Sequence, residues 1–90
     1  MANLGNFKIE NKSTDNGWTD LTTLAGITKS VVIQPISNDC MACQKATTPD
    51  VNEGFICPQR DYDTYYFNSS AKIWVKPFGP KPYVNINVNE

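Results

Sequence analysis

The chain of 90 residues contains no histidine. This absence excludes Ser/His/Asp and Cys/His nucleophile pairs, histidine metal ligands and a histidine-based pH switch. Charge is also scarce: 19% of the residues are charged, and eight basic against nine acidic residues leave a net charge of −1. A nearly neutral chain does not attract nucleic acid through its overall field. We therefore expect a non-enzymatic protein that needs no cofactor and binds no nucleic acid.

Long hydrophobic runs are absent as well. No stretch approaches the roughly 20 apolar residues of a membrane span. The start, Met1-Ala2-Asn3-Leu4-Gly5-Asn6, has neither the basic residues nor the apolar run of a signal peptide. We expect a protein that is made in the cytoplasm and has no membrane partner.

The sequence also lacks an amphipathic helix of three turns and is instead rich in short alternating segments. The clearest is 83–89, where Val84, Ile86 and Val88 share one face and asparagines share the other. A period of two over seven residues is typical of a half-buried strand. Asparagine is a poor strand former, so burial of the apolar face must drive this strand.

Residues 72–76 alternate too, with Ile73 and Val75 on one face and Trp74 on the other. Residues 77–82 contain three prolines and a glycine and cannot extend a strand ladder. We interpret them as a proline-rich hairpin loop, which predicts that the last two strands pair antiparallel.

Together with these two, we expect short strands at 7–10, 18–21, 30–36 and 62–67. Residues 1–6 are expected to be a flexible arm, and 37–54 a long irregular loop. Six to seven short strands between turn signals predict an all-β fold, a small antiparallel β-sandwich or barrel, with residues 1–90 in a single domain. The expected core comprises the apolar residues of these segments and their flanks: Phe7, Ile9, Trp18, Leu21, Ile27, Val31, Ile33, Phe55, Tyr65, Phe67, Ile73, Val75, Val84, Ile86 and Val88.

Three cysteines are present. Cys40 and Cys43 have the C-x-x-C spacing of a zinc knuckle or a redox pair. Structural zinc takes four ligands, so Cys57 and either Asp39 or Asp50 would have to complete the set. Four interpretations stay open: thiols in a loop or core, a disulfide to Cys57, a metal site and a redox pair.

Acidic and aromatic residues supply further candidates. Asp61 and Asp63 would share a strand face, which suits glycosidic chemistry or calcium, or a solvated strand entrance beside Arg60. Aromatic residues crowd one strand and its expected neighbour: Tyr62, Tyr65, Tyr66, Phe67 and Trp74. They indicate a core, a subunit interface or a platform for sugars.

The stiff 77–82 loop carries an apolar tip that fits either an interface or a fold back onto the protein's own core. The interface residues we predict lie in and around it: Trp74, Lys76, Phe78, Lys81 and Tyr83. Lys72, Lys76 and Lys81 flank Trp74 in the sequence.

Four segments follow one another in a familiar order: Gly-Trp-Thr-Asp-Leu at 17–21, Val-Val-Ile-Gln-Pro-Ile at 31–36, Ser-Ala-Lys-Ile-Trp-Val-Lys at 70–76 and Val-Asn-Ile-Asn-Val at 84–88. This arrangement resembles small β-sandwich structural proteins of tailed bacteriophage virions, in which a terminal Trp-containing β-hairpin closes the domain. The resemblance implies a capsid decoration or cement protein, or a head-fibre or tail subunit.

Such a protein would bind the major capsid protein or other virion proteins in many copies, as a homo-oligomer or a multivalent array, and would be located in the virion. Two other functions compete with this expectation. One is a carbohydrate-binding or adhesion module that uses Trp74, Tyr65 and Tyr66. The other is a small metal-binding domain built on Cys40, Cys43 and Cys57, with a hydrolase a distant fourth.

Overall fold

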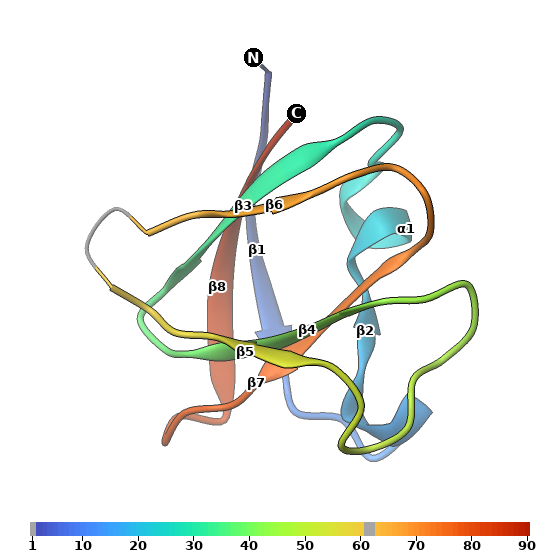
Figure 1. Cartoon of the computed structure of the whole chain (residues 1–90). Coiled ribbons are helices and arrows are strands. Elements are labelled where there is room, and N and C mark those ends of the chain that lie inside the picture. Colours follow the sequence, from blue (N-terminus) through green and yellow to red (C-terminus); the bar gives the residue numbers. More distant parts are fainter. Residues whose placement is uncertain (1, 61–62) are drawn as a thin grey trace.

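Two four-stranded antiparallel sheets pack against each other in the computed structural model, which describes residues 2–60 and 63–90 (Figure 1). One sheet has the order β1-β8-β3-β6 and the other β2-β7-β4-β5. The strands are β1 (Asn3–Glu10), β2 (Thr19–Asp20), β3 (Val31–Ile36), β4 (Cys40–Gln44), β5 (Phe55–Cys57), β6 (Tyr65–Phe67), β7 (Ile73–Pro77) and β8 (Tyr83–Asn89). A 3-10 helix, η1 (Asp15–Gly17), and one short α-helix, α1 (Leu21–Ala25), precede β3. The predicted all-β sandwich is confirmed.

Strand β8 has the two faces that its alternation predicts. Val84, Ile86 and Val88 are completely buried between the sheets, and the intervening asparagines are not. Each buried side chain of this size stabilises the fold by roughly 1.5–3 kcal/mol. Because β8 lies between β1 and β3, its backbone is paired on both sides, which offsets the poor strand propensity of asparagine.

The predicted hairpin of the last two strands is wrong. Strand β7 pairs with β2 and β4, whereas β8 pairs with β1 and β3 in the other sheet. Residues 77–82 therefore cross from one sheet to the other, although Pro77 still forms the last residue of β7, opposite Cys40. The buried Asn38 holds this crossing, because its Nδ2 donates hydrogen bonds to the carbonyls of Lys81 and Tyr83, both at 2.9 Å. Alternation reveals which face of a strand is buried, but not which strand lies beside it.

Two segments that we expected to be irregular contain strands. Residues 3–6 are not a flexible arm, because they form the start of β1 and pair with the end of β8. Within 37–54, residues 40–44 form β4, a central strand between β7 and β5. Apolar side chains on both faces hid β4 in the sequence, since a strand covered on both sides shows no alternation.

Most of the expected core is buried, with three exceptions at the rim. Phe7 and Tyr65 are half-buried, and Phe55 is exposed to 49%. Phe55 lies on β5, an edge strand of three residues, so no neighbouring strand covers its outer side. Tyr62, which we assigned to the strand at 62–67, lies outside the described residues.

Candidate functional site

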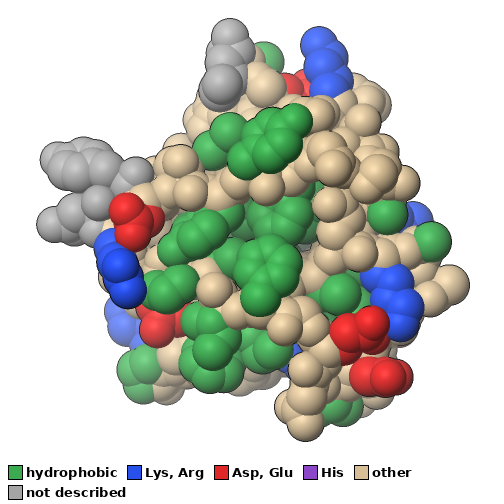
Figure 2. Space-filling view, viewed as in Figure 1, with side chains coloured by type: hydrophobic (Ala, Val, Ile, Leu, Met, Phe, Trp, Pro, Cys, Tyr) green, Lys and Arg blue, Asp and Glu red, His purple; other side chains and the backbone are tan. Residues whose placement is uncertain are grey.

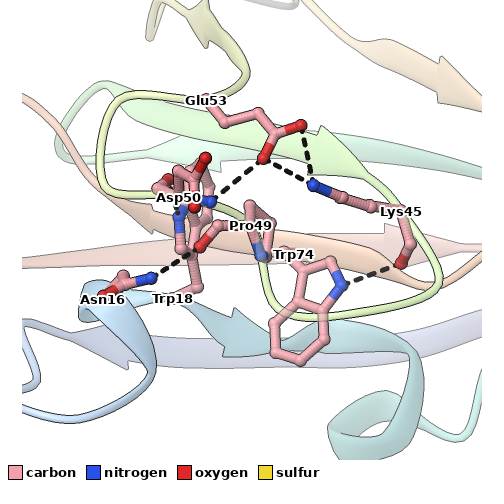
Figure 3. Close-up of polar contacts among 7 residues, drawn as sticks. All are labelled: Asn16, Trp18, Lys45, Pro49, Asp50, Glu53 and Trp74. Carbon is pink, nitrogen blue, oxygen red and sulfur yellow. Dashed lines mark hydrogen bonds and ion pairs between the residues drawn. The ribbon is translucent and has the colours of Figure 1, made fainter.

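The loop of residues 45–54 covers the outer face of the β2-β7-β4-β5 sheet (Figure 3). Trp18 and Trp74 lie beneath it in a small second core with Cys43. The Trp18 Nε1 donates to the carbonyl of Asp50 at 2.9 Å, and the Trp74 Nε1 donates to the carbonyl of Lys45 at 2.9 Å. Trp74 is therefore only 7% exposed, and it offers little surface to the interface or sugar platform that we predicted for it.

Lys76 also braces this loop. Its Nζ lies 4.4 Å from the centre of the Trp18 ring and donates to the carbonyls of Asn16 and Val51. Burial lowers the pKa of Lys76. The Lys76 ammonium group already contacts an indole face and two carbonyls within the protein. Lys76 therefore does not present a free charge to a partner.

Glu53 forms polar contacts across the same loop. Its carboxylate accepts from Lys45 Nζ at 2.9 Å and from the amide of Asp50 at 3.0 Å, and these contacts lower the pKa of Glu53. A folded-state pKa below the unfolded value of about 4.3 stabilises the protein above that pH, and this contribution is lost as the pH falls through the folded-state pKa. We expect Glu53→Gln to make the melting temperature less dependent on pH below about pH 5.

Circular dichroism melts from about pH 6 to about pH 2.5 measure this effect, with the exposed Glu10→Gln as a control that removes the same charge. Identical pH profiles for Glu53→Gln and the unmodified chain would contradict it.

The predicted interface residues do not form one surface. The Tyr83 ring lies on the outer face of the β1-β8-β3-β6 sheet, with Lys8 Nζ 5.0 Å and Lys81 Nζ 5.8 Å from its centre. Phe78 is exposed on the 77–82 crossing. Trp74 and Lys76 lie beneath the 45–54 loop on the other sheet, as described above.

The aromatic residues proposed as a sugar platform are separated too. Tyr65 is half-buried and donates its hydroxyl hydrogen to the carbonyl of Pro58 at 2.8 Å. Tyr66, the next residue, points to the opposite face and is 68% exposed. With Trp74 buried in the other sheet, these three side chains cannot contact one ligand together.

The three cysteines lie on two sides of one sheet. Cys40 and Cys57 face the main core, whereas Cys43 faces the tryptophans beneath the loop. Residues three apart on a strand point to opposite faces, so the C-x-x-C spacing cannot form a redox pair or offer both sulfurs to one ion. Within residues 2–60 and 63–90, no three Cys, Asp or Glu side chains lie close enough together to hold a metal.

The remaining candidates offer little chemistry. Asp63 pairs with Arg60 at 4.0 Å, and Asp61 lies outside the described residues.

Two surface hollows, of about 240 and 280 Å³, are smaller than typical small-molecule sites of roughly 300–1,000 Å³.

A more distinctive feature is an exposed apolar surface on the two edge strands β5 and β6. We call it the β5–β6 surface and define it by three exposed residues, Phe55, Ile56 and Tyr66. Phe55 is 49% exposed, Ile56 46% and Tyr66 68%. The ring of Phe55 stacks on that of Phe67 with centroids 5.8 Å apart, which joins the edges of the two sheets. Figure 2 shows hydrophobic side chains gathered on the face that carries β5 and β6 in Figure 1.

These two edges lack the usual protection against pairing with another chain. No charged residue occurs between Glu53 and Arg60 or between Asp63 and Lys72. By contrast, the edge strand β1 carries two exposed charges, Lys8 and Glu10, and a register shift next to Gly5. Charges and bulges on edge strands hinder association, so β5 and β6 are more open to a partner than β1.

Sequence reasoning placed Phe55 in the core and did not consider Ile56. The signal was nevertheless present. Phe55-Ile56-Cys57 is an apolar run of three between Gly54 and Pro58. Glycine and proline both interrupt strands, and their close spacing here permits only a very short strand. Short strands are typical of sheet edges.

No protein-family model, curated protein or solved structure matches the chain. Within the described residues, no helix has the length and apolar character needed to cross a membrane.

Proposed function

We propose that this protein is a non-enzymatic virion structural protein, a capsid decoration protein that binds the outer shell in many copies through its β5–β6 surface. The observation that carries the proposal is the uncharged, half-exposed aromatic and aliphatic surface on two adjoining edge strands. Large aromatic and aliphatic side chains left exposed on edge strands are a feature of protein-binding sites. The partner is the major capsid protein or another virion protein, and neighbouring copies add to the contact.

The size of the surface fits a multivalent role. Three exposed apolar side chains on two three-residue strands form a small contact, and a contact of this size is weak alone. Many copies on a repeating lattice convert weak single contacts into stable attachment. Because the surface carries no charge, we expect its binding to change little between low and physiological salt, unlike binding driven by ion pairs.

We expect the double variant Phe55→Ser, Tyr66→Ser to bind its source particles at least about 10-fold more weakly than the unmodified chain, because large aromatic side chains carry most of the energy of a protein interface. Co-sedimentation of the purified protein with particles stripped of it measures this affinity. Leu24→Ser is the matched control, because Leu24 is also 49% exposed but lies on α1.

Equal loss of binding in the Leu24 variant would argue against a role for the β5–β6 surface. No co-sedimentation of the unmodified chain with particles of its source would argue against the virion function itself.

A second candidate function, binding of neutral glycans as an adhesion module, rests on the outer face of the β1-β8-β3-β6 sheet. Asn3 Nδ2 donates to the side-chain oxygens of Asn87 at 2.9 Å and Asn89 at 3.0 Å. Tyr66 shares this face, because Tyr66 and Asn89 are both register partners of Val32. Amides and an exposed ring can bind hydroxyl groups and a sugar face.

A glycan array distinguishes the two functions. Hits that disappear in Asn87→Ala would favour the adhesion module, whereas capsid binding through the β5–β6 surface should survive this substitution.

A further inference from the structure

Cys40 and Cys57 form a pair that the C-x-x-C spacing does not suggest. They are register partners on the neighbouring antiparallel strands β4 and β5. Both are completely buried, and both are free thiols. Directly opposed residues of an antiparallel pair have Cα atoms about 4.5–5.5 Å apart, which lies inside the range of about 4.4–6.8 Å seen across disulfides.

Cys43 cannot take part in this pair. It lies on the opposite side of β4, beneath the loop of residues 45–54, whereas Cys40 and Cys57 belong to the main core. The strand backbone separates the sulfur of Cys43 from the other two. Only one intramolecular pairing therefore fits the fold.

We propose that Cys40 and Cys57 are a redox-sensitive pair, which forms a cross-strand disulfide when the protein meets a small disulfide oxidant such as oxidised glutathione. The pair is inferred from strand register and burial and does not depend on the proposed virion function.

The position of Cys57 makes it the first thiol to react. It is the last residue of β5, a three-residue edge strand, whereas Cys40 lies on a central strand paired on both sides. Local opening of a short edge strand exposes Cys57 while most of the fold persists. The hydrogen bond with Cys40 lowers the pKa of Cys57, and the same bond, together with burial, raises the pKa of Cys40. Cys57 is thus the better source of a thiolate.

The exchange takes two steps. The Cys57 thiolate attacks one sulfur of oxidised glutathione, which forms a mixed disulfide and releases one glutathione thiolate. Cys40 then loses its proton and attacks the Cys57 sulfur, which forms the Cys40–Cys57 bond and releases the second glutathione. Two protein thiols are oxidised and one glutathione disulfide is reduced, and the two protons lost by the protein end on the two released thiols.

The new bond would close residues 40–57 into a loop that includes the segment covering Trp18 and Trp74. Cross-linking a loop of this length restricts the unfolded chain, which stabilises the folded protein. We expect the oxidised protein to melt about 5 °C or more above the reduced protein. A reducing cytoplasm keeps such a pair as thiols, and an oxidising exterior allows it to close.

The test compares the purified protein before and after incubation with oxidised glutathione. We expect loss of two hydrogen atoms in the intact mass and one alkylatable thiol where there were three. Trypsin leaves Cys40 and Cys43 on the peptide 30–45 and Cys57 on the peptide 46–60, so the two peptides should be joined. Cys43→Ala should still form this cross-link, whereas Cys57→Ala should not.

Three results would overturn the proposal. One is a folded protein whose three thiols all stay alkylatable after prolonged exposure to the oxidant. Another is an end product that carries glutathione on Cys57 with no bond to Cys40. The last is loss of the cross-link in Cys43→Ala while circular dichroism shows that this variant is folded. Because oxidation of the unmodified chain is the primary measurement, a Cys57→Ala variant that fails to fold does not affect the outcome.

Discussion

Gly54→Ala is expected to lower the free energy of unfolding by about 3 kcal/mol or more. A Cβ at this position would lie 2.6 Å from the carbonyl oxygen of Ala42, 3.1 Å from Cη2 of Trp18 and 3.2 Å from Cβ of Cys43. The closest of these atoms belongs to the backbone of the central strand β4, which cannot move without breaking its pairing. Gly54 also has a φ of +118°, which disfavours any residue with a side chain.

Gly5→Ala separates the two effects. Gly5 has almost the same backbone angle, with φ at +120°, but the nearest atoms to an added Cβ belong to Phe7 and lie 3.8 Å away. We expect Gly5→Ala to lower the free energy of unfolding by only about 1–2 kcal/mol, which is the cost of the backbone conformation without a steric clash. Urea unfolding of both variants measures the difference. Equal losses at the two positions would show that the approach of Gly54 to β4 is not close.

Trp18→Ala is expected to destabilise the protein by about 3–5 kcal/mol, a large part of the total stability of a domain of this size. The indole is completely buried, donates to the carbonyl of Asp50 and supports the ammonium of Lys76. Its removal leaves a large cavity, and it also removes the indole hydrogen bond to the loop and the ring beneath the Lys76 ammonium. The loop of residues 45–54 should then detach and expose Trp74.

Two measurements check this expectation. Thermal unfolding gives the loss of stability, and the emission of the remaining tryptophan, Trp74, should shift to longer wavelength as the loop detaches. Tyr66→Ala is the control, because removing an aromatic ring that is 68% exposed should change stability by no more than about 0.5 kcal/mol. An unchanged emission spectrum in a folded Trp18→Ala protein would mean that the loop stays in place without its anchor.

The fold class was predictable because it depends on local patterns. The alternation of Val84, Ile86 and Val88 identified a strand and its buried face, and the structure confirms both. Proline cannot donate to a strand ladder, and β6 accordingly pairs only with residues 31–33 and leaves Pro35 unpaired on that side. Backbone geometry and side-chain period act over a few residues, so the sequence alone reveals them.

The candidate site was far less predictable. Trp74 alternates as an outward-facing residue and does point outward from its sheet, yet a loop some 25 residues earlier in the chain covers it. Phe55 looks like a core residue, yet it lies at an edge where the sheet ends. Whether a side chain is exposed depends on which distant segments of the chain pack over it. The local sequence pattern does not show this.

By itself, the sequence of this protein determined that its backbone forms short strands, and which face of most of them is apolar. Only the tertiary structure decided that β7 and β8 belong to different sheets, that Cys40 faces Cys57 and not Cys43, and that the ring of Phe55 on one sheet edge stacks on Phe67 of the other. These outcomes follow from strand pairings between segments far apart in the sequence, and such pairings are chosen by the burial of the whole molecule, which no local pattern encodes.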